Sequence, residues 1–155
     1  MDIEFFEPSA ACKTCGQCCK SLPGAHVPDD FGLDLIESVR AKLASGRYAL
    51  DWWEGDVAES RELDSVLYLR PATKRLEGKV FDGSWGGECT FLTPSGCSLA
   101  RPDMPAECKA LRPRSSRKGD CPSTFGKQEV ALAWRPYQSL LAMIADEIQR
   151  QKEAA

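Results

Sequence analysis

The chain has 155 residues, about the length of one ordinary domain, so we expect a single domain over residues 1–155. Hydrophobic residues make up 43% of the sequence and charged residues 28%, as in a globular protein and unlike a disordered or membrane-embedded one. The formal net charge of −3 gives no overall attraction to phosphate backbones or anionic lipids. These values argue against nucleic acid and membranes as partners.

The eight cysteines are the most informative feature of the composition, because they exceed ordinary usage without reaching the density of a disulfide-stapled miniprotein. The first eight residues carry three acids and no apolar run, so we do not expect a secretory signal. The best apolar stretch, Leu140 to Ala145, is far shorter than the roughly 18 residues of a membrane helix. We therefore expect a cytoplasmic protein, in which clustered cysteines are metal ligands or catalytic groups rather than disulfides.

The predicted elements begin after a cysteine-dense, turn-rich loop that extends to about residue 28. A helix is predicted next, capped by Asp29 or Asp30 and ended by Gly46. Its apolar residues recur at every fourth position: Phe31, Leu35, Val39 and Leu43. An aromatic stretch follows with Tyr48, Trp52 and Trp53, and then an acidic segment from residue 54 to 62.

Strands are predicted over residues 65–70, 78–82, 88–92 and 130–134, with glycine turns between the second and the third. The last element is a helix from about Pro136, with the C-terminal strand and this amphipathic helix together covering 128–154. Five residues share one apolar face of the helix: Tyr137, Leu140, Leu141, Ile144 and Ile148. The predicted fold class is α+β, a small irregular domain with a short antiparallel sheet, flanking helices and cysteine-rich metal-binding loops gathered at one end.

The first cysteine cluster is Cys12-x2-Cys15-x2-Cys18, followed directly by Cys19. Three thiolates at this spacing are typical of ferredoxin-type loops, in which successive cysteines surround one iron–sulfur cluster. Zinc also uses pairs of cysteines two residues apart, but typically as separated pairs. Adjacent side chains diverge, so Cys18 and Cys19 are expected to serve different centres, unless one of them is a spare or redox thiol. The pattern indicates a metal site and favours iron–sulfur over zinc by a narrow margin.

The second set of cysteines is more widely spaced and comprises Cys89, Cys97, Cys108 and Cys121. A turn at residues 93–96 would place Cys89 and Cys97 at the two ends of a hairpin. Eight thiolates suffice for two four-cysteine sites. One site with four buried apolar thiols, or no metal at all, remains open.

These residues resemble a known family. The Cys12-x2-Cys15-Gly-x-Cys18-Cys19 cluster, the run from Cys89 through Gly96-Cys97 to Arg101-Pro102, and Cys108 resemble the CxxCxxCC, or YkgJ-type, zinc- or iron-chelating family. This family is related to the metal-binding part of flagellin lysine N-methylase, and the resemblance covers roughly residues 10 to 125. It implies that all eight cysteines are metal ligands in a small bacterial cytosolic protein, and it leaves zinc against iron open.

Other residues have simpler interpretations. His26, the only histidine, is expected to face solvent in a loop, with a role as ligand or proton donor as the alternative. Arg101 is expected to bond a carbonyl or an anionic thiolate site, and the Trp52–Trp53 pair to pack. A basic stretch is expected to be a solvated loop that offsets thiolate charge, with RNA or an acidic partner as the alternative: Arg112, Arg114, Arg117 and Lys118. Standard hydrolase, kinase and dehydrogenase motifs are missing from the sequence.

Three classes of function therefore remain. The first is a protein that holds an iron–sulfur cluster, of the [4Fe-4S] type, with an electron-transfer, sensing or metal-supply role. The second is an interaction module that a structural Zn²⁺ ion stabilises, with a protein partner. The third is an enzyme that uses an open iron position. The expected partners are metal ions and, in the second class, another protein.

Overall fold

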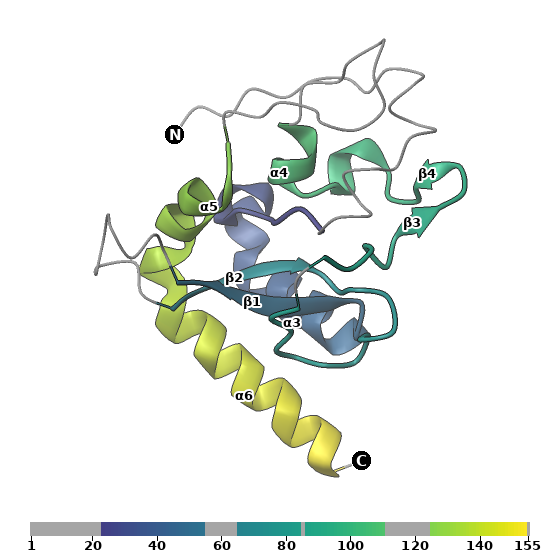
Figure 1. Cartoon of the computed structure of the whole chain (residues 1–155). Coiled ribbons are helices and arrows are strands. Elements are labelled where there is room, and N and C mark those ends of the chain that lie inside the picture. Colours follow the sequence, from purple (N-terminus) through teal and green to yellow (C-terminus); the bar gives the residue numbers. More distant parts are fainter. Residues whose placement is uncertain (1–22, 55–64, 85, 111–124, 155) are drawn as a thin grey trace.

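The computed structural model describes residues 23–54, 65–84, 86–110 and 125–154. Their elements are, in chain order, η1 (Pro28–Asp30), η2 (Gly32–Asp34), α3 (Leu35–Ser45), β1 (Tyr48–Trp53), β2 (Val66–Pro71), β3 (Leu92–Thr93), β4 (Gly96–Cys97), η4 (Arg101–Asp103), α4 (Ala106–Lys109), α5 (Lys127–Trp134), η5 (Arg135–Tyr137) and α6 (Gln138–Ala154). The helices lie beside a short antiparallel sheet, and the fold class is α+β, as predicted (Figure 1). Among the described helices, none combines the length and the apolar character that crossing a membrane requires.

The central sheet consists of β1 and β2, which pair so that Tyr48 lies opposite Pro71 and Trp53 opposite Val66. The prediction of a strand over residues 65–70 is confirmed by β2. The sequence indicated only an aromatic stretch at β1, and it is this stretch that supplies the partner strand. Leu50 and Leu69 face each other in the register, and both are fully buried. The sheet therefore contributes the middle of the hydrophobic core.

The strands predicted over residues 78–82 and 88–92 are wrong as strands, because neither segment pairs along its length; within 88–92 only Leu92 belongs to a strand, as the first residue of β3. Leu50 forms a parallel bridge with Phe81, and Thr73 forms an antiparallel bridge with Cys89. Beyond the first bridge the chain turns, since the Asp82 side chain accepts a hydrogen bond from the Ser84 N–H at 3.0 Å. Both segments consequently lie along the sheet without extending it.

The predicted N-terminal helix begins later than expected. Two 3₁₀ turns, η1 and η2, precede α3, and Gly32, the first residue of η2, has a φ of +53° that interrupts a continuous helix. The predicted end at Gly46 is confirmed, since this residue adopts the left-handed conformation (φ 78°) and its N–H caps the Leu43 carbonyl. Val39 and Leu43 are the residues that α3 buries.

The strand predicted over residues 130–134 is wrong, and the segment is the helix α5. A short apolar run such as Val-Ala-Leu-Ala-Trp fits a strand or a buried helix equally well. Gly126 decides between them locally, because its N–H donates to the Glu129 carboxylate at 3.0 Å and its carbonyl accepts from the Val130 N–H. The helix then buries Val130, Ala131 and Trp134 on one face.

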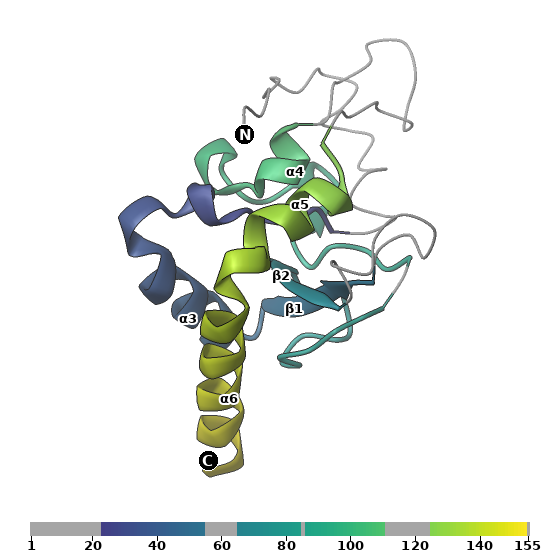
Figure 2. The same cartoon turned by 90° about the vertical axis from the view of Figure 1, so that its left-hand side faces the viewer.

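The long C-terminal helix α6 is confirmed. Of the residues predicted for its apolar face, Leu141, Ile144 and Ile148 are buried, and Ala145 is buried with them. Figure 2 shows α3 and α6 side by side, and an ion pair between Arg40 and Glu147 (2.9 Å) joins them. The opposite end of the molecule from the C-terminus of α6 carries β4 and α4 (Figure 1). Cys97 ends β4 and Cys108 lies in α4, so two of the cysteines are at this end.

Candidate metal centre

Cys89 and Cys97 flank the predicted hairpin, which is present as β3 and β4. Cys97 pairs with Leu92, and the Leu92 N–H donates to the Cys89 carbonyl at 3.0 Å. The turn is closed by the Thr93 hydroxyl, which donates to the Gly96 carbonyl at 2.7 Å. No disulfide joins Cys89, Cys97 and Cys108 to one another. The hairpin therefore holds Cys97, whereas Cys89 precedes β3 by three residues and bridges Thr73.

Cys89 is a buried thiol in the hydrophobic core. Burial is the main cause that raises its pKa to about 11, and the nearby Cys97 raises it further. The positive charges of Arg70 and Arg47 lower the pKa and offset part of this rise. Cys89 is consequently a neutral thiol at pH 7 unless a cation stabilises the thiolate. A bound metal ion supplies that stabilisation, because a coordinating thiol loses its proton.

The Cys108 thiol lies directly against the backbone of Gly24. A Cβ atom on Gly24 would stand 2.4 Å from Cys108 Sγ and 3.1 Å from the Cys108 nitrogen, closer than real contacts of this kind. Only glycine allows this approach. The close contact places the thiol beside the chain that follows the first cysteine cluster in the sequence.

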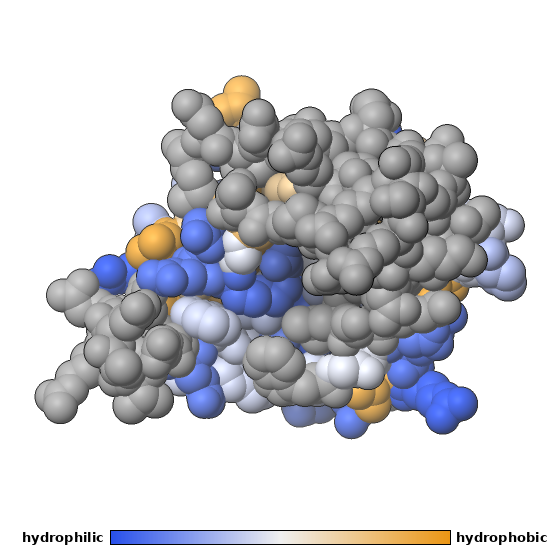
Figure 3. All heavy atoms as spheres, turned by 45° about the horizontal axis from the view of Figure 1, so that its top comes forward, coloured by the Kyte–Doolittle hydropathy of each residue, from blue (hydrophilic) through white to orange (hydrophobic). Residues whose placement is uncertain are grey.

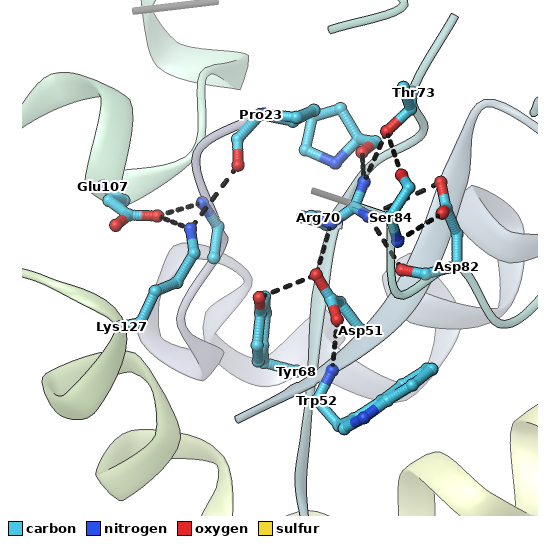
Figure 4. Close-up of polar contacts among 12 residues, drawn as sticks. Pro23, Asp51, Trp52, Tyr68, Arg70, Thr73, Asp82, Ser84, Glu107 and Lys127 are labelled. Atoms are coloured by element: carbon cyan, nitrogen blue, oxygen red, sulfur yellow. Dashed lines mark hydrogen bonds and ion pairs between the residues drawn. The ribbon is translucent and has the colours of Figure 1, made fainter. Parts of the chain in front are cut away.

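Glu107 and Lys127 form an ion pair beside this contact, and Figure 4 shows their side chains pointing toward each other. The Glu107 carboxylate also accepts a hydrogen bond from the Ala25 N–H at 2.8 Å, and the Glu107 N–H donates to the Ala25 carbonyl at 3.1 Å. Lys127 donates to the Pro23 carbonyl at 3.5 Å. Together these bonds join three stretches of chain: the one that begins at Pro23, the one that ends at Ala110 and the one that begins at Phe125.

Five of the predicted ligands lie outside the described residues: Cys12, Cys15, Cys18, Cys19 and Cys121. Within the described residues, no group of three or more His, Cys, Asp or Glu side chains is placed to hold a metal ion. Cys89, Cys97 and Cys108 therefore do not make a metal site among themselves. Their assignment as ligands stays a prediction that needs the other cysteines.

The expectation that His26 faces solvent is wrong, because the residue is 2% exposed. Its N–H donates to the Leu69 carbonyl at 2.9 Å, and its own carbonyl accepts from the Trp134 indole at 2.7 Å. These bonds fix His26 between β2 and α5. This burial could not be predicted from the residues next to His26, because its partners Leu69 and Trp134 are far away along the chain.

The His26 ring packs among aromatic side chains, with centroids 4.8 Å from Phe31 and 5.8 Å from Tyr48. Burial lowers the pKa of His26, and a hydrogen bond of 2.7 Å between Nδ1 and Asp30 opposes that shift in part. In the described part of the chain Nε2 has no hydrogen-bond partner. This environment favours a neutral imidazole and does not present it as a surface ligand.

The remaining predicted residues have separate outcomes. Arg101 donates to the Lys109 carbonyl at 3.4 Å, which agrees with the predicted bond to a carbonyl. Trp53 packs against the core, whereas Trp52 is 38% exposed. The basic stretch lies outside the described residues: Arg112, Arg114, Arg117 and Lys118.

A buried charge network beneath the sheet was not predicted from the sequence. Arg70 has no exposed surface, and its Nε donates to Asp51 at 3.0 Å while Nη2 donates to the Asp82 carbonyl at 2.7 Å (Figure 4). Tyr68 donates to the same Asp51 carboxylate at 2.9 Å, and Arg70 Nη1 donates to the Pro71 carbonyl at 2.8 Å. The available signal was Arg70 at the end of an apolar strand and Asp51 in the middle of an aromatic stretch.

The described surface visible when the cysteine-bearing end is tilted forward is mainly hydrophilic, with separate apolar residues (Figure 3). Comparison of the chain with protein-family models, with curated proteins and with solved structures finds no match. The function is therefore inferred from the residues and their geometry.

Proposed function

We propose that the chain binds metal through cysteine thiolates, that the centre is an iron–sulfur cluster, and that the protein transfers electrons, senses or supplies metal in the cytoplasm. The observation that carries this proposal is the joining of three chain stretches beside Cys108. Pro23 follows the Cys12–Cys19 cluster, and Phe125 follows Cys121. The bonds of Glu107 and Lys127 hold both starting points next to α4.

Short connections to the described chain allow the thiols of Cys19 and Cys121 to come close to Cys108. Cys19 precedes Pro23 by four residues and Cys121 precedes Phe125 by four residues. Four residues of extended chain span at most about 14 Å. Thiols attached by such short connections can reach the surroundings of Cys108 in a compact arrangement.

The donor set fits a thiolate-ligated metal. The ligands would be the eight cysteines: Cys12, Cys15, Cys18, Cys19, Cys89, Cys97, Cys108 and Cys121. Bound iron–sulfur would supply one-electron chemistry and a cation to stabilise the thiolates. Because Gly24 has no side chain, Cys108 Sγ can lie against its backbone, and Cys97 is held opposite Leu92 in the hairpin.

Anaerobic purification followed by elemental analysis tests the proposal. We expect a brown protein that contains iron and acid-labile sulfide, and a Cys108→Ser variant with less of both. A colourless protein with stoichiometric zinc, and no iron after anaerobic reconstitution, would replace the cluster with a structural zinc site. A wild-type chain that takes up neither metal would refute metal binding altogether.

The same sample separates an electron carrier from an enzyme. A cluster whose irons all have cysteine ligands has no open position for a substrate, and its electron paramagnetic resonance spectrum stays unchanged when small ligands such as cyanide are added. A spectrum that shifts on addition would instead support the metalloenzyme.

A further inference from the structure

The Glu107–Lys127 ion pair lies at a partly enclosed position, with side chains that are 16% and 13% exposed. Solvent screens such a pair less than it screens a pair on the open surface. The pair connects α4 with α5, and each of its members also bonds the stretch that begins at Pro23. One pair of opposite charges therefore holds three stretches of chain.

This pair is also next to Cys108 in the chain and in space. Glu107 precedes Cys108 in α4 and exchanges two hydrogen bonds with Ala25, whose neighbour Gly24 contacts the thiol. Displacement of the Glu107 carboxylate releases the Ala25 N–H and thereby the close approach of Gly24 to Cys108. The position of the Cys108 thiol relative to the stretch that begins at Pro23 therefore depends on the Glu107–Lys127 ion pair.

Lys127 links the same pair to the hydrophobic core. Its ammonium group lies 5.4 Å from the centre of the Tyr68 ring in β2, and Tyr68 in turn donates to the buried Asp51. The cation thus contacts the sheet on one side and the carboxylate of α4 on the other. Lys127 therefore contacts both α4 and β2.

We propose that Glu107 and Lys127 are positioning residues that couple metal binding to the folded core, an inference that rests on the proposed function. The pair holds Pro23 and Phe125, the residues that follow the two cysteine-bearing stretches, beside Cys108 before metal binds. Metal binding then has to order fewer residues, which lowers its entropic cost. Because coupling between two equilibria is reciprocal, metal binding also stabilises the contacts between Ala25 and Glu107. Loss of the pair weakens metal binding about tenfold, the size of effect typical of residues that orient metal ligands.

The test uses the full-length apoprotein and Zn²⁺ in competition with a chromophoric chelator, together with thermal unfolding. Lys127→Met keeps the apolar stem over Tyr68 and removes the charge, whereas Glu107→Gln keeps an acceptor for the Ala25 N–H. Both variants are expected to bind Zn²⁺ about tenfold more weakly than wild type. Lys127→Arg, which preserves the charge, is expected to bind nearly as wild type does.

The matched control is Glu147→Gln, which removes an ion pair between α3 and α6 away from the cysteines. It is expected to leave the Zn²⁺ affinity unchanged. Hydrogen exchange at Ala25 is expected to slow on Zn²⁺ addition in wild type, and less so in Lys127→Met. If Lys127→Met does not fold, Glu107→Gln carries the test. Wild-type affinity in Glu107→Gln would overturn the coupling while leaving metal binding intact, whereas a wild type that binds no metal would refute both.

Discussion

Gly24 and Cys108 approach each other so closely that a Cβ atom on Gly24 would lie 2.4 Å from the cysteine sulfur. The two residues are brought together by hydrogen bonds of their neighbours Ala25 and Glu107. A side chain at position 24 would therefore require the partly exposed Cys108 thiol, or the backbone beside it, to shift. The contact places Cys108, a predicted metal ligand, beside the stretch of chain that follows the four predicted ligands of the Cys12–Cys19 cluster.

Gly24→Ala is therefore expected to displace the Cys108 thiol, to lower the free energy of unfolding by about 1–3 kcal/mol, and to reduce metal content. Chemical denaturation and elemental analysis measure the two effects. A double variant separates them, because Cys108→Ala removes the sulfur that the new methyl group meets. In that background Gly24→Ala should cost much less stability; an equal cost in both backgrounds would show that the strain lies elsewhere.

Arg70→Met is expected to destabilise the protein strongly, by about 3–5 kcal/mol, because it leaves the carboxylates of Asp51 and Asp82 in the interior without their cation. Urea denaturation of the variant measures the loss. Arg40→Met is a suitable control, since it removes an arginine that pairs at the surface with Glu37 and Glu147, and its effect should be far smaller. Similar losses in the two variants would contradict the importance of the buried network.

The two longest helices and β2 could be predicted from local pattern alone. The stripe that includes Leu141, Ile144 and Ile148 identified α6, and Gly46 marked the end of α3, because helix periodicity and left-handed caps are properties of neighbouring residues. The error at α5 had a local signal too, since Glu129 stands three residues after Gly126 and its carboxylate accepts a hydrogen bond from the Gly126 N–H before the apolar run.

The residues that surround the candidate site could be predicted less well, because their roles come from distant partners. Glu107 and Lys127 are twenty positions apart, and each taken alone has the character of a solvated surface residue. His26 is buried by contacts with β2 and α5, neither of which is near it in sequence. Cysteine spacing, by contrast, predicts ligands independently of the fold; all eight of those ligands stay predictions, and five of them lie outside the described residues.

Cys15→Ser is expected to lose metal and solubility together, because Cys15 is the middle member of three cysteines at ferredoxin spacing. Cys19→Ser is expected to be milder, since Cys19 stands outside that spacing. The metal-to-protein ratio of the two soluble fractions provides the comparison. Equal metal content in wild type and Cys15→Ser would contradict the assignment of the first cluster.

Stability is expected to fall as the pH decreases below about 6.5, because burial holds the pKa of His26 below its ordinary value of 6.5. Between the lowered pKa and 6.5, the unfolded state binds a proton at His26 that the folded state does not bind. The contribution is therefore complete above pH 6.5 and is lost as the pH falls through the folded pKa. Denaturation midpoints of the apoprotein between pH 5 and 7.5 should show this slope and His26→Gln should flatten it; an unchanged slope in the variant would assign it to other groups.

Metal removal is expected to affect the N-terminal stretch and to leave the core folded. Residues 1–22 hold four predicted ligands and few large apolar residues, so coordination supplies most of the free energy that orders them. The core depends instead on α3, α6 and the central sheet, whose buried side chains need no metal. Limited proteolysis after chelation should therefore cleave before Pro23 while the far-UV circular dichroism of the helices persists. Loss of the helical signal on chelation would show that the metal holds the whole domain together, and identical cleavage with and without chelator would remove the first cluster from the ligand set.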